Sequence, residues 1–284
     1  MKQGVLLLAH GAPERVEDVE AYLGFVRAGR PKNPAIVEEI AHRYAAIGGS
    51  SPLTHWTRVQ AEALEKLLGI PVFFAMRNWH PFIRETVDAI RTSGVERLVG
   101  ICLAPQFSTM SVGLYIRRTE EAWGTDNIAW AKTYHDQPEL IEAFAERLRP
   151  IAAGRHIIFT AHSLPEKALA GGDPYDVECR RTAELVAERA GVTNWEFAYQ
   201  SQGMTEDKWL GPTVESLLDR FKGREVVIDP IGFVCDHVEV LYDIDIAFRD
   251  YAAARGITVL RPESLNGSAT YTAALASVAR RCLA

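Results

Sequence analysis

The feature that most constrains the fold is a repeat of strand and loop. Leu7–Glu14 and Phe159–Glu166 lie 152 residues apart. Each consists of an apolar residue, any residue, Ala-His, two further residues and Pro-Glu. The apolar runs Val5–Ala9 and His156–Ala161 that lead into the two motifs predict buried strands. The repeat therefore indicates two similar halves, each with a histidine at the carboxyl end of its first strand.

Further apolar runs alternate with segments of helical spacing. Strands are expected at Pro71–Met76, Leu98–Ala104, Trp195–Gln200, Val226–Ile231 and Thr258–Leu260, and helices at 19–26, 36–47, 55–68, 83–90, 182–190 and 214–221. This alternation is typical of parallel sheets with right-handed crossovers. We predict an α/β fold of two similar Rossmann-like domains, each a doubly wound parallel sheet, at residues 1–150 and 151–284, facing each other across a cleft.

Composition and charge exclude several classes of protein. The 284 residues are 48% hydrophobic, enough for a large core, and the net charge of −6 without a basic run argues against a nucleic-acid partner. No apolar stretch approaches the roughly 20 residues of a transmembrane helix, and no signal peptide is evident. The four cysteines are too far apart for a zinc or cluster motif. We expect a cytoplasmic, monomeric protein with no transmembrane segment.

An acidic segment follows the strand at Val226–Ile231. Within Gly232–Asp245 and just beyond, apolar residues have helical spacing, and acids recur at steps of three, four and seven: Asp236, Glu239, Asp243 and Asp250. One helix would carry them as a stripe whose repulsion costs a few tenths of a kcal/mol per pair, roughly. A solvated acidic face is the plain interpretation. The alternative is a site that handles cations, in which a histidine facing the carboxylates binds a divalent metal or relays protons.

Several segments resemble the signature sequences of ferrochelatases. They are Ala161–Glu166, Gln200-Ser201 with Trp209–Pro212, Gly232–Asp245, Arg43-Tyr44, Ile47–Leu53, Leu103–Ser108 and Arg261–Asn266. The resemblance implies a chelatase-like fold of two Rossmann-like domains. It also implies insertion of ferrous iron, as substrate, into a porphyrin, with release of two protons. No tightly bound cofactor is expected. The chain has no cysteine-bearing C-terminal extension, so no iron–sulfur cluster is expected either.

The resemblance also assigns residues. His162 and Glu239 match the pair at the macrocycle face, acting as proton acceptor and metal ligand with their individual roles left open. Asp236 and Asp243 would continue outward as a proton or metal path. Residues that match those holding the four propionates of coproporphyrin III are all present: Arg27, Arg43, Tyr44, Ser51 and Tyr115. This set favours coproporphyrin III, giving coprohaem, whereas the ending Glu263–Asn266 is closer to enzymes that use protoporphyrin IX.

His10 departs from the coproporphyrin enzymes, in which a tyrosine at this position ligates the product iron. Imidazole is a good ligand for haem iron, so we expect His10 to ligate it here. The alternative is a structural histidine that bonds the Gly11–Pro13 turn. Two other functions also remain open: a haem- or porphyrin-binding protein without catalysis, and a cobalt chelatase on the same fold. The expected partners are the porphyrin substrate, the haem product and transient partners in haem synthesis.

Overall fold

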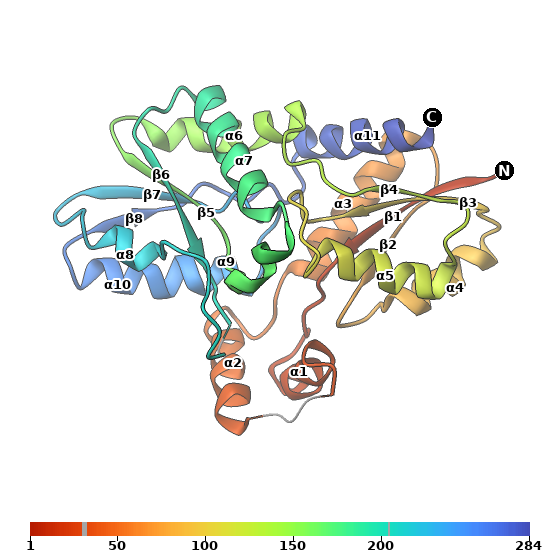
Figure 1. Ribbon diagram of the computed structural model, residues 1–284, viewed down its shortest axis with the longest axis horizontal. Coiled ribbons are helices and arrows are strands. Elements are labelled where there is room, and N and C mark those ends of the chain that lie inside the picture. The colour runs from red at the N-terminus through yellow and green to blue at the C-terminus, as the bar shows by residue number, and fades with distance from the viewer. Residues whose placement is uncertain (30–32, 204) are drawn as a thin grey trace. The chain divides into compact units, whose positions relative to one another are not determined.

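The computed structural model describes residues 1–29, 33–203 and 205–284 (Figure 1). The chain divides into two compact units. The first comprises Met1–Ala104, Thr109–Tyr134 and Asn266–Ala284, and the second comprises Pro105–Ser108 and His135–Leu265. This division differs from the boundary expected at residue 150. Helix α6 (Pro138–Ala152) packs on elements of the second unit, and the C-terminal helix α11 (Ala269–Leu283) packs on elements of the first.

The first unit is built on a parallel sheet in the order β2-β1-β3-β4. The strands are β1 (Gln3–Ala9), β2 (Val72–Met76), β3 (Arg97–Cys102) and β4 (Ile128–Ala131). The helices are η1 (Val16–Asp18), α1 (Val19–Val26), α2 (Pro34–Ala46), α3 (Leu53–Leu68), α4 (Ile83–Thr92), α5 (Val112–Trp123) and α11. Helices α3 and α11 pack together against the sheet, and α4 packs with α5 (Figure 1). Because both faces of β1 are covered, Val5–Leu8 is apolar and buried without alternation.

The second unit repeats this plan with the order β6-β5-β7-β8, again parallel. Its strands are β5 (His156–His162), β6 (Trp195–Gln200), β7 (Glu225–Asp229) and β8 (Thr258–Leu260). Its helices are α6, η2 (Glu166–Gly171), α7 (Tyr175–Ala190), α8 (Val214–Leu218), α9 (Val238–Leu241), the π-helix η3 (Asp243–Phe248) and α10 (Arg249–Ala253). The two sheets have equivalent strand orders, so the prediction of two similar Rossmann-like halves is confirmed.

The topology places the sites of interest at strand ends. In each unit the first strand lies between the second and third, so the direction of winding reverses beside it. Ligands of open α/β sheets bind at the carboxyl ends of the strands at such a reversal. His162 is the last residue of β5, and His10 directly follows β1. No helix within the described ranges is long and apolar enough to cross a membrane.

The acidic segment does not form the single regular helix that its spacing predicted. Four α-helical residues, Val238–Leu241, are followed by the π-helix, in which the amide of Ala247 donates to the carbonyl of Tyr242, five residues earlier. The wider π-turn shifts the register. Asp243 is therefore buried while Asp250 is exposed, and the expected continuous carboxylate stripe is wrong.

Candidate active site

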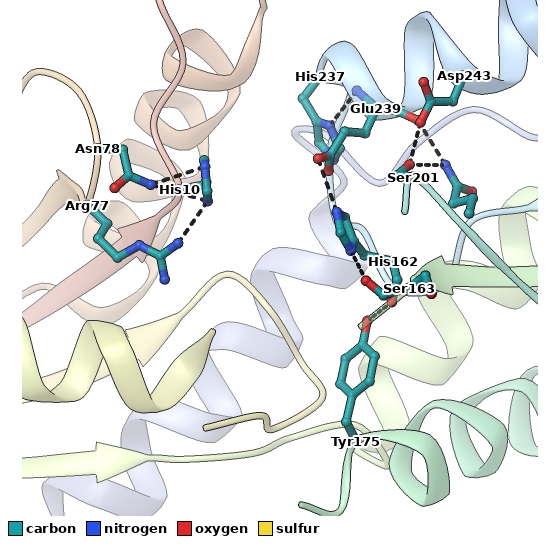
Figure 2. A network of polar contacts seen from close by, with 11 residues as sticks. His10, Arg77, Asn78, His162, Ser163, Tyr175, Ser201, His237, Glu239 and Asp243 are labelled. Atoms are coloured by element: carbon teal, nitrogen blue, oxygen red, sulfur yellow. Dashed lines mark hydrogen bonds and ion pairs between the residues drawn. The ribbon is translucent and has the colours of Figure 1, made fainter. Parts of the chain in front are cut away.

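A histidine–carboxylate pair lies at the carboxyl edge of the second sheet. His162 ends β5 and Glu239 lies on α9, and Nε2 of the histidine is 3.4 Å from Oε1 of the glutamate (Figure 2). Their side chains are 31% and 39% exposed, so both are accessible to solvent. The structure therefore brings together the two residues that the sequence analysis assigned as the central pair.

The surroundings of His162 determine its tautomer. Nδ1 lies within hydrogen-bonding distance of the Ser163 carbonyl, which can only accept, so Nδ1 carries a proton. Nε2 is thus the basic nitrogen of the neutral ring, and it faces the Glu239 carboxylate. Burial lowers the pKa of His162, but Glu239, the Ser163 carbonyl and the Asp243 carboxylate together raise this pKa above its ordinary value. The hydroxyl of Tyr175 donates to the His162 carbonyl at 2.9 Å, which fixes the backbone below the ring.

His237 caps the short helix that carries Glu239. Its Nδ1 accepts a hydrogen bond from the backbone N–H of Glu239 at 3.1 Å, and its ring packs edge-on against Phe233, with 4.6 Å between ring centroids. Burial lowers the pKa of His237, in keeping with a neutral ring that accepts at Nδ1. We conclude that this histidine has a capping and packing role.

The two aspartates assigned to a path have different surroundings. Asp243 is buried and accepts a hydrogen bond from the hydroxyl of Ser201 (Figure 2). Asp236 accepts from Ser264 Oγ at 2.7 Å and lies 3.3 Å from Arg261 Nη1. Arg261 also binds Asp245 through two nitrogens, at 2.7 and 3.1 Å. Asp236 is therefore held in an ion-pair network, and its contacts favour a structural role.

Gly232 allows the acidic segment to pass close to strand β5. A Cβ at this position would lie 2.7 Å from Cβ and 2.8 Å from Cα of Ala161, closer than real Cβ atoms approach. The amide of Gly232 donates to the Thr160 carbonyl at 3.1 Å. Only glycine fits this approach, which places the segment beside the strand that carries His162.

In the first unit, His10 contacts two residues that follow β2. Nη2 of Arg77 lies 3.4 Å from Nδ1 of the histidine, and the side-chain amide of Asn78 lies 3.1 Å from Nε2 (Figure 2). A guanidinium can only donate, so Nδ1 accepts and the neutral ring carries its proton on Nε2. The atom of Asn78 nearest to Nε2 is its amide nitrogen Nδ2, at 3.1 Å, and exchanging the nitrogen and oxygen of this amide would let the oxygen accept from Nε2–H. These partners differ from the Gly11–Pro13 turn considered in the sequence analysis.

The residues assigned to the propionates all belong to the first unit but differ in their contacts. Tyr115 on α5 is buried, and the guanidinium carbon Cζ of Arg77 lies over its ring, 4.9 Å from the ring centroid. Arg43 pairs with Glu39 at 2.8 Å on α2, beside the buried Tyr44. Ser51 Oγ accepts from the amide of Leu53 at the start of α3. Arg27 directly follows α1 and, among the described residues, has a buried Nε without a hydrogen-bond partner.

Four residues that contact candidate residues of their own unit were not given a role by the sequence analysis. They are Arg77, Asn78, Gln200 and Ser201, and each pair occupies the equivalent position in its unit, at the end of the second strand or just after it. The internal repeat was the signal that could have found them, because it places these positions beside the two repeated histidines. Among the described residues, no three His, Cys, Asp or Glu side chains are grouped to hold a metal ion.

Comparison with solved structures defines the class of fold. The sirohydrochlorin chelatase SirB from Bacillus subtilis subspecies spizizenii, solved with cobalt, covers 99% of this chain and 95% of its own, with a TM-score of 0.63 at 14% identity. A second SirB structure, with Fe3+, has the same TM-score. The fold is therefore that of chelatases.

Comparison of sequences defines the family. The ferrochelatase family model matches residues 2–283. A ferrochelatase of Acidobacterium capsulatum is 42% identical over 98% of this chain and 94% of its own, and one of Deinococcus radiodurans is 39% identical over 98% and 95%. A coproporphyrin III ferrochelatase of Geobacillus sp. (strain WCH70) is 37% identical over 98% and 96%. The chain belongs to the ferrochelatase family, a family of metal-inserting enzymes, and the expectation from its signature segments is confirmed.

Proposed function

We propose that the protein inserts ferrous iron into coproporphyrin III, with His162 and Glu239 as the central pair. The observation that carries the proposal is the 3.4 Å approach of the basic nitrogen of His162 to the Glu239 carboxylate. One imidazole nitrogen and one carboxylate oxygen are ligand types suited to a ferrous ion that must be bound and then released.

The pair also suits the removal of the pyrrole protons. In the neutral form of His162, Nε2 has a lone pair directed at a carboxylate, so protonation of the ring converts a repulsive contact into an ion pair. The raised pKa of His162 expresses this preference. His162 Nε2 therefore accepts a pyrrole proton, and Glu239 stabilises the imidazolium that forms. Asp243 is the next acidic residue after Glu239 in the sequence, and it accepts a hydrogen bond from Ser201. We assign the onward proton path to its carboxylate.

The choice of coproporphyrin III rests on the arginines and on relatives. Arg27 has no carboxylate partner among the described residues, so its planar fork is available to a propionate, whereas Arg43 must share its charge with Glu39. Relatives from Geobacillus and Bacillus carry the name coproporphyrin III ferrochelatase, and those from Acidobacterium and Deinococcus the plain name. Protoporphyrin IX is the competing substrate.

We also propose that His10 ligates the iron of the product. The hydrogen bonds of its ring determine what must change before it can do so. Both ring nitrogens are engaged, one by Arg77 and one by Asn78. Coordination therefore requires the ring to release one of these bonds. Absorption spectra of bound product in wild type and in His10→Ala test this proposal, and unchanged axial-ligand bands would rule out ligation.

The test of function is anaerobic turnover of coproporphyrin III and protoporphyrin IX side by side, followed as loss of porphyrin fluorescence. We expect faster turnover of coproporphyrin III and near-complete loss of activity in His162→Ala and Glu239→Gln, both folded. Preferential turnover of protoporphyrin IX would replace the substrate assignment. Tight porphyrin binding without metal insertion would indicate a carrier, and insertion of cobalt into a cobalamin precursor alone would indicate a cobalt chelatase.

A further inference from the structure

The separation of His162 and Glu239 depends on how two different elements are joined. His162 belongs to the sheet, whereas Glu239 lies on a helix of four residues, too short to be held by its own hydrogen bonds. Gln200, the last residue of β6, is the register partner of His162 and is 3% exposed. It is therefore a buried neighbour of His162 within the second unit.

The side-chain amide of Gln200 links strand to helix. Its Nε2 donates to the Glu239 carbonyl at 2.9 Å and to Ser201 Oγ at 3.3 Å, and its Oε1 accepts from Thr160 Oγ1 at 2.6 Å. The orientation of the amide is determined, because a backbone carbonyl cannot donate. Thr160 is fully buried on β5, two residues before His162. A single amide thus connects the strand that carries the histidine to the backbone of the glutamate.

The next residue makes a parallel connection. Ser201 has φ +59°, a left-handed conformation that costs a non-glycine residue roughly 1 kcal/mol or more. In this conformation its hydroxyl donates to the Asp243 carboxylate. Adjacent residues at the end of β6 therefore contact both acids, Gln200 through the backbone of Glu239 and Ser201 through the side chain of Asp243.

The internal repeat places equivalent residues at the same point of the first unit. Arg77 and Asn78, at the end of β2, both contact His10. In each unit, a residue directly after the second strand therefore contacts a histidine or a carboxylate of that same unit. Packing alone does not require a polar residue at this position in both units.

We propose that Gln200 is a positioning residue that sets the separation between His162 and Glu239 by tying the Glu239 backbone to strand β5. The proposal rests on the proposed iron insertion. Without the amide, α9 has one fewer link to the sheet, and Glu239 moves relative to the basic nitrogen of His162.

The test compares Gln200→Met with Gln106→Met. Gln106 is the matched control because it is 2% exposed, belongs to the same unit, and donates to Thr182 Oγ1 and the Ile231 carbonyl instead of to Glu239. We expect Gln200→Met to lower kcat for iron insertion about 10- to 100-fold, the range typical of residues that orient metal ligands, with KM for the porphyrin unchanged. Gln106→Met should keep kcat within about twofold while losing comparable thermal stability.

A milder variant and a direct measurement complete the test. Thr160→Val removes only the hydroxyl that holds Gln200 Oε1, so it should lower kcat less than Gln200→Met, and the double variant should be no worse than Gln200→Met alone. Crystal structures should show a longer His162–Glu239 separation in Gln200→Met. An unchanged separation, or wild-type kcat in Gln200→Met, overturns the positioning role while leaving the proposed function intact. A wild-type enzyme that inserts no iron overturns the function, and the crystallographic separation then still decides the role of Gln200.

Discussion

Replacing Asp229 by asparagine should stabilise the protein, increasingly so as the pH rises. Asp229 ends β7, is 2% exposed, and has an Oδ2 atom without a hydrogen-bond partner in the described structure. Burial raises the pKa of this carboxyl to about 8, against the lowering effect of Arg261. The folded protein therefore holds a proton on Asp229 at neutral pH that the unfolded chain releases.

The magnitude follows from the difference between the two pKa values. The ordinary pKa is 3.8, so the favourable contribution of the neutral carboxyl is complete below about pH 4 and is lost as the pH rises towards 8. The loss is about 1.4 kcal/mol per pH unit, or about 4 kcal/mol by pH 7. Asparagine has the same shape and no proton to lose, so Asp229→Asn escapes this penalty.

Urea unfolding of wild type and Asp229→Asn between pH 4 and pH 8 measures the effect. We expect the difference in unfolding free energy to grow steadily over this range in favour of the variant. Asp219→Asn is the control, because the Tyr251 hydroxyl and Arg255 lower the pKa of this exposed carboxyl, so its replacement should not stabilise the protein. A difference between wild type and Asp229→Asn that is constant with pH would show that Asp229 is ionised in the folded state and would refute the reasoning.

Three further predictions concern the site and its support. Glu239→Gln should lower the pKa of His162, because the carboxylate that favours the imidazolium is lost while burial still disfavours it, and NMR titration of the ring will show this; an unchanged pKa would contradict the ion pair. Gly232→Ala should cost about 1–3 kcal/mol in thermal unfolding through its clash with β5, whereas Gly171→Ala, whose Cβ meets nothing within 4 Å, should be near neutral. Arg27→Ala should weaken binding of coproporphyrin III about tenfold or more, with a smaller effect on protoporphyrin IX, in fluorescence titrations, and equal losses would make this arginine structural.

Much of the fold was predictable because buried parallel strands are nearly uniform apolar runs. The sequence of β1 and β5, with their repeated Ala-His motif, was enough to predict two similar halves. Some elements escaped the pattern analysis. Strand β4 has four residues, of which only Ala131 is buried, and α11 is rich in small residues that give little contrast between its faces. Both are recognisable only through the surfaces they cover.

The candidate site was predicted less evenly. The family signature identified His162 and Glu239, and the structure places them in contact. The π-helix was not predictable, since acids at steps of three, four and seven suit a regular α-helix equally well. Two residues of the π-helix contact distant parts of the chain: Asp243 accepts a hydrogen bond from Ser201, and Asp245 forms an ion pair with Arg261. No local pattern encodes such partners.

The return of α11 to the first unit has a consequence for biosynthesis. The second unit is complete once Leu265 has been translated, whereas the first unit lacks a helix of its core until Asn266–Ala284 has emerged from the ribosome. N-terminal domains usually fold first during synthesis. Here the first unit can be completed only after the second, because its last helix is translated last. Before then, the apolar face of α3 and the surface of β3 and β4 that α11 covers stay open to chaperones, and truncation from the C-terminal side should damage the half of the molecule that begins the chain.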